Sequence, residues 1–301
     1  MTFVAARTFP KRTLVISDTR LTDPSGSLRS GDGRHQIDNC IPGQVKIVPL
    51  NSRLSIAYAG SIIRALDAIR HVASSGHDDD VEVCNSLRLV SLNGDVEFLI
   101  VSHLSGSAKV IKAANGVLSL HQDMHWIGDP SVTALLTSEI FRTKEQGKPF
   151  RAKMFAQDPE DDQWEEWSFG RGWSNLLLQS PKLVPGVGGI PIVLNAIVAG
   201  HHYHISAGAV IGEDVSVYGD GRWVNSSGVA VEPLYGQYSY SIVTSGIDGT
   251  AVVGVWLQEI GTGYLYLPLD QDEPITLKDG SIDVLAAAVK ENASRLAERN
   301  C

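Results

Sequence analysis

The sequence predicts a layered α+β fold in which helices cover the outer faces of antiparallel sheets. Short apolar runs occur in pairs joined by tight turns, which is typical of β-hairpins. These pairs alternate with two segments of helical periodicity, 61–75 and the residues that follow Gly128. Groups of strands separated by single helices favour covered sheets over a doubly wound parallel sheet.

The N-terminal quarter predicts two hairpins and a helix. Residues 2–8 and 13–18 form two strands around a turn that contains Pro10, and 45–50 with 54–60 form a second pair. Residues 23–44, rich in Gly, Ser, Asp and Asn, predict a long exposed loop. Apolar residues at helical spacing follow on one face, and they are Ile62, Ala65, Leu66, Ile69, Val72 and Ala73.

The middle of the chain predicts more strands and a second helix. Residues 96–104, 108–114 and 117–122 are three successive strands, joined by Ser-Gly-Ser and Asn-Gly turns. Asp129 is the expected N-cap of the second helix, with Pro130 at its first position.

The C-terminal third continues with a strand pair at 190–198 and 201–205 and then changes in character. We divide the chain into a domain at 1–205 and an extension at 206–301, which is either a small second domain or a continuation of the first sheet. The expected elements of the extension are strands at 238–246, 250–260 and 264–269 and a helix at 281–299.

Composition excludes several classes of function. A net charge of −9 with no basic stripe argues against a nucleic-acid partner. Three cysteines without a Cys-x-x-Cys pair predict neither a disulfide framework nor a zinc site, which fits a reducing compartment. The longest apolar run, 186–200, contains Pro191 and is too short to cross a bilayer. We therefore expect a soluble, cytoplasmic protein without a membrane partner, and the acidic runs 77–82 and 158–167 are interpreted as solvated loops.

Thr2 is the first candidate for chemistry. Removal of Met1 is expected before a small residue, and it leaves a hydroxyl and a free α-amine on the same residue. The α-amine has an ordinary pKa of about 7.7–8.0, which suits a proton acceptor near neutrality. A threonine activated by its own amine is a recognised nucleophile.

Other residues strengthen this hypothesis because the predicted strands bring them toward Thr2. Asp18 and Arg20 stand where the second strand ends beside the first, and Lys46 opens the third strand. A lysine ammonium stabilises an alkoxide, and a carboxylate orients the lysine. Gly60, between the fourth strand and a helix, can present its N–H to an oxyanion.

These motifs resemble those of the N-terminal-nucleophile hydrolases, in particular the proteasome β-subunits and the HslV-type threonine peptidases. The segment Ile16–Thr22 (I-S-D-T-R-L-T) is similar to the family's A-D-S-R-A-T, and Asp18 keeps the family's spacing of sixteen positions after the threonine. Lys46-Ile47, Ala59-Gly60 and Val187-Gly188-Gly189-Ile190 match further family motifs. The resemblance covers about residues 2–205 and is most specific in the first sixty.

The resemblance implies a four-layer αββα sandwich and amide hydrolysis through an acyl-enzyme on Thr2, with no metal or other cofactor. It assigns Asp18, Lys46 and Gly60 to catalysis and leaves Arg20 and Asp129 as supporting residues. The implied substrate is a peptide or protein, and the implied assembly is a homo-oligomer such as a ring, with an ATPase or unfoldase partner left open.

Departures from the family keep two other functions open. Asp129 stands where a serine is expected after Gly128, and no aspartate precedes Gly188 as the family pattern requires. Asp129 either supplies the missing carboxylate or simply caps a helix. The chain could thus be an inactive, proteasome-like assembly subunit. The third reading is an amidohydrolase that acts on a small amide.

Two further patterns have structural interpretations that we prefer to functional ones. The histidines of 201–204 place His202 and His204 on one strand face, but no third metal ligand is near them in sequence. The tryptophans at 164, 167, 173 and 223 are expected in core or interface packing rather than at a peptide-binding surface.

Overall fold

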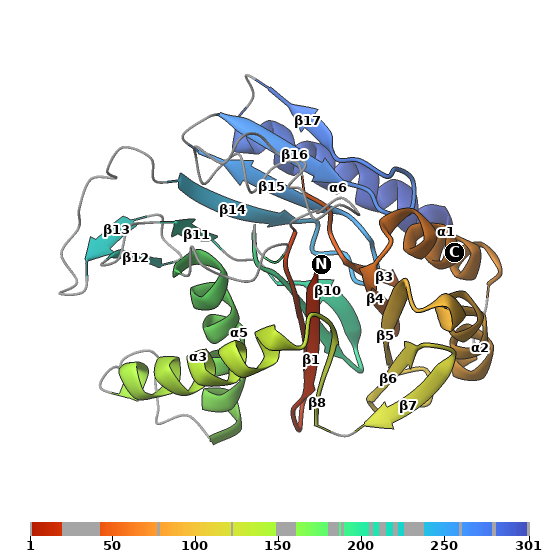
Figure 1. Cartoon of the computed structure of the whole chain (residues 1–301). Coiled ribbons are helices and arrows are strands. Elements are labelled where there is room, and N and C mark those ends of the chain that lie inside the picture. Colours follow the sequence, from red (N-terminus) through yellow and green to blue (C-terminus); the bar gives the residue numbers. More distant parts are fainter. Residues whose placement is uncertain are drawn as a thin grey trace.

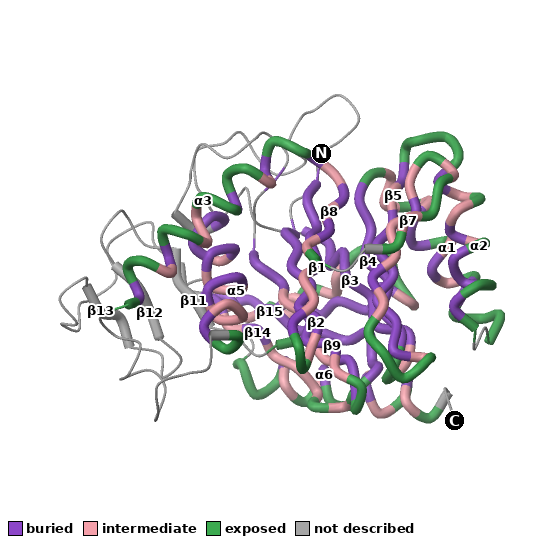
Figure 2. The backbone as a smooth tube through the Cα atoms, turned by 90° about the horizontal axis from the view of Figure 1, so that it is seen from below, coloured by how far each residue is buried: buried purple, intermediate pink, exposed green. Residues whose placement is uncertain are grey.

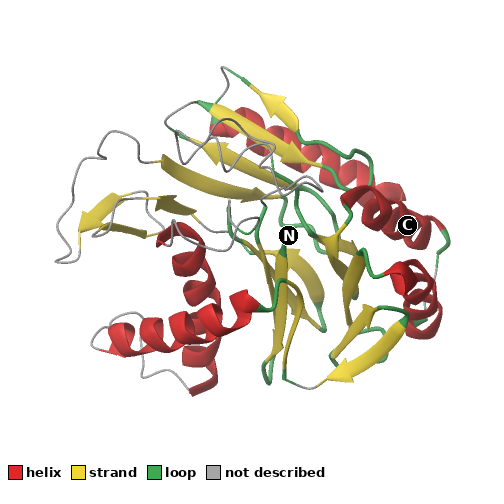
Figure 3. Ribbon diagram, viewed as in Figure 1, coloured by secondary structure: helices red, strands yellow, loops and turns green. Residues whose placement is uncertain are grey.

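The protein is a mixed α+β structure with several antiparallel sheets, as the sequence predicts. The computed structural model describes residues 2–19, 43–76, 79–121, 123–148, 161–179, 187, 190–204, 207–210, 215–218, 222–225, 238–258, 261–278 and 281–299. Figure 3 shows the sheets at the centre of the molecule and the helices at its periphery.

The first sheet contains the N-terminal hairpin. Its strand order is β10-β9-β2-β1-β8, and every neighbouring pair is antiparallel. β1 and β2 are almost wholly buried, which explains why their sequences are continuous apolar runs. The strands are β1 (Phe3–Thr8), β2 (Thr13–Ser17), β8 (Met124–Gly128), β9 (Ile192–Ile197) and β10 (Gly200–Tyr203).

The second sheet follows the chain in simple order, β3-β4-β5-β6-β7, again with antiparallel pairs. Its fourth and fifth strands are joined by the Asn115-Gly116 turn, in which both residues have positive φ. The strands are β3 (Ile47–Asn51), β4 (Leu54–Gly60), β5 (Val96–Ser102), β6 (Lys109–Ala114) and β7 (Val117–His121).

A third sheet comes from the C-terminal part of the chain, in the order β11-β14-β15-β16-β17. A separate hairpin of β12 (Val215–Tyr218) and β13 (Arg222–Asn225) precedes its main strands. The strands of the sheet are β11 (Ala207–Val210), β14 (Tyr238–Thr244), β15 (Val253–Leu257), β16 (Thr262–Tyr266) and β17 (Ile275–Leu277).

Five α-helices are described, and each lies on the outer side of a sheet (Figure 1). α1 (Ile62–Ser74) and α2 (Asp80–Val90) cover the second sheet, and the short 3-10 helix η1 (Ser91–Asn93) follows them. α3 (Ser131–Gly147) and α5 (Asp161–Gln179) cover the first sheet. α6 (Ile282–Arg299) packs on the third.

The interpretation of the two acidic runs as solvated loops is wrong within the described residues, because each run begins a helix. Asp79 caps α2 by accepting a hydrogen bond from Val81 N–H, and Asp80 is buried and paired with Lys109. α5 begins at Asp161, and its Trp164 is buried. Carboxylates in the first turn of a helix are favourable because they oppose its dipole.

Alternation along the strands separates the core into layers. In β1, Val4 and Ala6 face inward to a central cluster, whereas Phe3 and Ala5 face outward to α3 and α5. The central cluster lies among all three sheets. Figure 2 shows that buried residues, in purple, follow one another along strands of these sheets. Trp164 and Trp173 are fully buried, which confirms the packing role expected for these two tryptophans.

Strands on both sides of residue 205 contribute to the central cluster. Val253 and Val255 of β15 pack there with Val4 and Val15 of the N-terminal hairpin. The division into domains at residue 205 stays a prediction. Among the described helices, none is long and apolar enough to cross a membrane.

Candidate functional site

Pairing of β1 with β2 places Asp18 beside Thr2. Val4 lies opposite Ser17, so the next residues outward, Phe3 and Asp18, face each other at the end of the hairpin. One carboxylate oxygen, Asp18 Oδ1, accepts hydrogen bonds from Thr2 Oγ1 at 2.9 Å and from Phe3 N–H at 3.3 Å. The proximity of Thr2 and Asp18 predicted from the sequence is therefore found in the structure.

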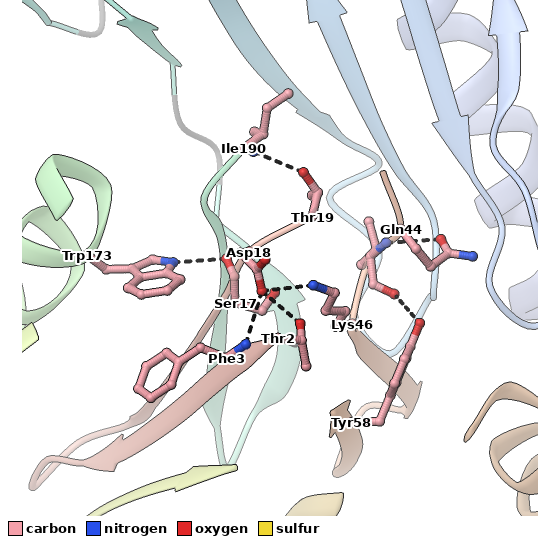
Figure 4. Close-up of polar contacts among 11 residues, drawn as sticks. Thr2, Phe3, Ser17, Asp18, Thr19, Gln44, Lys46, Tyr58, Trp173 and Ile190 are labelled. Atoms are coloured by element: carbon pink, nitrogen blue, oxygen red, sulfur yellow. Dashed lines mark hydrogen bonds and ion pairs between the residues drawn. The ribbon is translucent and has the colours of Figure 1, made fainter. Parts of the chain in front are cut away.

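Lys46 reaches the same oxygen from the second sheet. It lies directly before β3, and its Nζ is 2.8 Å from Asp18 Oδ1 (Figure 4). Thr2 Oγ1 and Lys46 Nζ share one acceptor and so lie within about 6 Å of each other. The exposed fractions of Thr2, Asp18 and Lys46 are 6%, 0% and 2%. Because they are buried, the charges of Asp18 and Lys46 are screened only weakly by water.

Neighbouring residues hold Asp18 from two sides. The indole Nε1–H of Trp173 in α5 donates to the carbonyl of Ser17 at 2.9 Å. On the other side, Thr19 Oγ1 accepts a hydrogen bond from Ile190 N–H at 2.9 Å. Both contacts appear in Figure 4. These two hydrogen bonds therefore hold the residues on both sides of Asp18 in place, independently of the charge of the carboxylate.

Lys46 is held through its main chain. Tyr58 in β4 donates its backbone N–H to the Lys46 carbonyl at 3.0 Å and its hydroxyl to the Val45 carbonyl at 3.3 Å. Complete burial raises the pKa of the Tyr58 phenol, so this hydroxyl stays protonated and acts as a donor. Before Lys46, the Gln44 N–H donates to the Thr19 carbonyl at 2.8 Å, which ties the two halves of the site together.

Gly60 ends β4 as predicted and is exposed. Its φ of +104° is a conformation that favours glycine, and a Cβ there would lie 2.0 Å from the carbonyl oxygen of Asp95. These local contacts explain the glycine without a substrate. The suggested role of the Gly60 N–H toward an oxyanion stays a prediction.

Asp129 lies next to Thr2 through its backbone. Its N–H donates to the Thr2 carbonyl at 2.9 Å, while its carboxylate accepts from Ser131 N–H at 2.9 Å and Ser131 Oγ at 2.7 Å. α3 begins at Ser131, later than the sequence predicts, with Pro130 at the N-cap position. The carboxylate thus bonds the first turn of α3. Arg20, the other supporting residue, is outside the described residues, as is most of the expected loop 23–44.

Two charged residues near Thr2 were missed from the sequence. Glu97 Oε2 in β5 accepts a hydrogen bond from Gly128 N–H at 2.7 Å, and Glu97 Oε1 is 3.3 Å from Lys112 Nζ. Gly128 has a φ of +89°, and a Cβ there would be 1.9 Å from the Thr2 carbonyl oxygen. The Glu97–Lys112 pair therefore lies beside the backbone of Thr2. No motif marks it, because each residue looks like an ordinary polar position of a strand.

A second buried polar cluster involves the histidines at 201–204. His201 Nδ1 lies 2.8 Å from Ser55 Oγ, and its Nε2 lies 2.8 Å from His103 Nδ1. Burial lowers the pKa of His201 to about 3 and also lowers that of His103, so both rings are neutral near pH 7. His202 contacts Asp248 and Asn195 instead.

We found no group of three or more metal-ligating side chains among the described residues. No protein-family model matches the chain, and no curated protein matches it in sequence. The site is thus defined by its own geometry, in which a buried threonine hydroxyl and a lysine ammonium converge on one carboxylate oxygen.

Proposed function

We propose that the protein is an N-terminal threonine hydrolase that cleaves amide bonds through an acyl-enzyme on Thr2. The observation that carries this proposal is the shared acceptor: Asp18 Oδ1 receives both Thr2 Oγ1–H and Lys46 Nζ. Strand order and helix placement are compatible with the four-layer αββα sandwich that the resemblance to proteasome β-subunits implies. The four-layer αββα sandwich is itself part of what we propose.

In the proposed reaction, Thr2 Oγ attacks the substrate carbonyl carbon and its proton passes to the Thr2 α-amine. The negative charge of the tetrahedral intermediate is stabilised by the Lys46 ammonium, which Asp18 holds, and by the N–H of Gly60. Collapse breaks the C–N bond, and the α-amine returns the proton to the leaving amine. Water then hydrolyses the Thr2 ester by the same proton transfers.

Labelling of Thr2 tests this proposal. Purified protein is expected to begin at Thr2 by intact mass and N-terminal sequencing, and to form a covalent adduct with a peptide β-lactone or epoxyketone. Thr2→Ala should abolish the adduct, whereas Thr8→Ala, at the opposite end of β1, should retain it. Retained Met1, or a free Thr2 that forms no adduct, contradicts the hydrolase.

Peptides are the proposed substrates, and small amides are the alternative. Wild-type protein that forms the adduct is expected to cleave fluorogenic peptides faster than amino-acid amides of the same acyl residue. A reversed preference in kcat/KM assigns the protein to the amidohydrolases. Because an ATPase or unfoldase would only feed such a site, its presence does not affect this comparison.

A second candidate function is assembly without catalysis. The exposed apolar residues at one edge of the second sheet support it. Among the described strands, β7 is the last of that sheet, and it carries the exposed large apolar residues Val117, Leu118 and Leu120. Leu89 and Leu92, on α2 and η1 beside this edge, are exposed as well. An exposed apolar edge strand is a template for pairing with another chain.

We propose that a second copy of the chain pairs with this edge. Antiparallel pairing about Ser119 places Leu118 opposite Leu120 of the partner and sets no charges of like sign side by side, since residues 117–120 are uncharged. Leu120→Lys is expected to convert an oligomer to a monomer in sedimentation. Ile63→Lys, on α1, is the control, because Ile63 and Leu120 both have exposed fractions of 65%. Wild-type protein that sediments as a 32.4 kDa species contradicts assembly.

A further inference from the structure

A loop of the C-terminal region contacts the segment that carries Lys46. The side chain of Gln44 is buried, and its Nε2 donates to the carbonyl oxygen of Asp272 at 2.6 Å. Its Oε1 accepts a hydrogen bond from Val45 N–H at 2.9 Å (Figure 4). Both ends of this amide are therefore occupied, one by the residue before Lys46 and one by a residue 228 positions away.

Gln44 also contacts Thr19, the residue that follows Asp18. Its N–H donates to the carbonyl of Thr19, and the preceding Gly43 packs so closely on Thr19 that a Cβ would lie 2.2 Å from that carbonyl oxygen. The segment 43–46 thus runs between the end of β2 and the C-terminal loop. A shift of this segment would change the distance between Lys46 Nζ and Asp18.

The loop itself is fixed independently of Gln44. Arg70 in α1 donates from Nε to the Pro268 carbonyl at 3.2 Å and from Nη1 to Asp272 Oδ1 at 2.7 Å. The loop also closes on itself, because Asp270 N–H and Gln271 N–H both donate to the Leu267 carbonyl. These backbone hydrogen bonds involve neither Arg70 nor Gln44, so the fold of the loop that presents the Asp272 carbonyl does not depend on a single side chain.

We propose that Gln44 is a positioning residue, which uses the Asp272 carbonyl to keep Lys46 in contact with Asp18. The C-terminal sheet then contributes to the site, because the loop after β16 determines, through Gln44, where the Lys46 ammonium lies. This inference rests on the proposed hydrolase function for its kinetic test, but the contacts that carry it do not.

Gln44→Met tests the inference, because it removes both side-chain hydrogen bonds, keeps a similar volume and adds no charge. Arg70→Met is the matched control, since it removes another tether of the same loop but leaves the backbone hydrogen bonds of the loop and both Gln44 contacts in place. The measurement is the rate of Thr2 acylation by a β-lactone between about pH 5 and pH 9.

We expect Gln44→Met to react about 10-fold more slowly, with the midpoint of the acidic limb at higher pH. The reason is that a displaced Lys46 ammonium no longer disfavours protonation of the neighbouring α-amine. Arg70→Met should keep the wild-type midpoint. A wild-type rate and midpoint in Gln44→Met, or an equal shift in both variants, overturns the inference.

A second measurement separates this inference from the proposed function. If wild-type protein is not acylated, the hydrolase proposal fails, and the position of Lys46 is then read by NMR of protein labelled at lysine Cε. The Lys46 resonance, assigned with Lys46→Met, should move in Gln44→Met and stay in Arg70→Met. An unmoved resonance in Gln44→Met overturns the positioning role.

Discussion

Two buried polar clusters join the same pair of sheets, and they differ in charge. The first cluster consists of Thr2 and Asp18 from the first sheet and Lys46, which directly precedes β3 of the second sheet. Three donors in it share one carboxylate oxygen. The other cluster links His201 of β10 to Ser55 of β4 and to His103 after β5. The residues of both clusters are buried from solvent.

The difference shows how burial alone fails to identify a site. Two neutral imidazoles and a hydroxyl satisfy one another at little electrostatic cost, so the histidine cluster is explained as a link between sheets. An ammonium and a carboxylate lose far more hydration when they are buried, and their mutual attraction offsets this cost only where their geometry is good. The charged cluster can also stabilise a developing negative charge, which the neutral one cannot do.

Asp18→Asn is expected to have the largest effect, because it removes the negative charge that opposes the buried Lys46 ammonium. Leaving one member of a buried ion pair uncompensated costs about 3–5 kcal/mol of unfolding free energy. Thr2 acylation should fall by about 100-fold or more. Denaturant unfolding and labelling kinetics measure the two effects, and an Asp18→Asn protein with wild-type reactivity would contradict the assignment of Asp18.

Paired glycine substitutions compare the two clusters directly. Gly128 lies beside Thr2 and Gly249 beside His201, to whose carbonyl its N–H donates, and both have positive φ. A Cβ would lie 1.9 Å from Thr2 O at the first position and 2.3 Å from Asn51 C at the second. We expect Gly128→Ala and Gly249→Ala each to cost about 3 kcal/mol, from strain and overpacking.

Only Gly128→Ala should slow the labelling of Thr2, because only that Cβ displaces the nucleophile. Mass spectrometry of the adduct over time provides the measurement for both variants. Equal loss of reactivity in the two proteins would mean that the histidine cluster influences Thr2, and the distinction between the clusters would not hold.

The pH dependence of stability tests the neutral state of His201. Its pKa is about 3 in the folded protein and about 6.5 when unfolded, so the unfolded chain binds more protons between these values. Stability from this group is fully present above about pH 6.5 and is lost as the pH falls, by about 2 kcal/mol at pH 5. Urea unfolding of His201→Gln should show a shallower slope in this window, and a slope equal to that of the wild type would contradict the neutral state of His201.

Trp173→Phe should have the smallest effect. It removes the hydrogen bond to the Ser17 carbonyl and keeps an aromatic ring near Phe3, whose centroid lies 5.4 Å from the Trp173 ring. The expected loss is about 1 kcal/mol in thermal or denaturant unfolding. Labelling of Thr2 should change by less than about threefold, and a larger change would mean that this indole positions Asp18 and does not merely stabilise the fold.

Much of the fold could be predicted because its signals are local. The strands at 13–18 and 54–60 and the helices at 61–75 and 281–299 are found within one or two residues of their expected bounds. The second helix of the N-terminal half was missed because its start, Asp80, reads as part of an acidic surface run. Only the fold shows that Ser102 and Lys109 bind this carboxylate.

In the candidate site, too, the local contacts could be predicted and the long-range ones could not. The nearness of Thr2 and Asp18 follows from one hairpin, whose register is set by two adjacent strands. Lys46 could be selected by residue type but not located, since its approach depends on how two sheets pack. Gln44, Glu97 and the Ser55–His201 contact were beyond prediction, because each partner lies on a different sheet or far along the chain.

The central cluster has a consequence for biosynthesis. Val4 and Val15 are translated before Val253 and Val255, yet all four side chains belong to the same central cluster. A nascent chain can close its N-terminal hairpin early, but the central cluster is complete only when the third sheet has also been made. A prematurely terminated chain that lacks β14 and β15 therefore cannot complete the cluster in which Val4 and Val15 are buried.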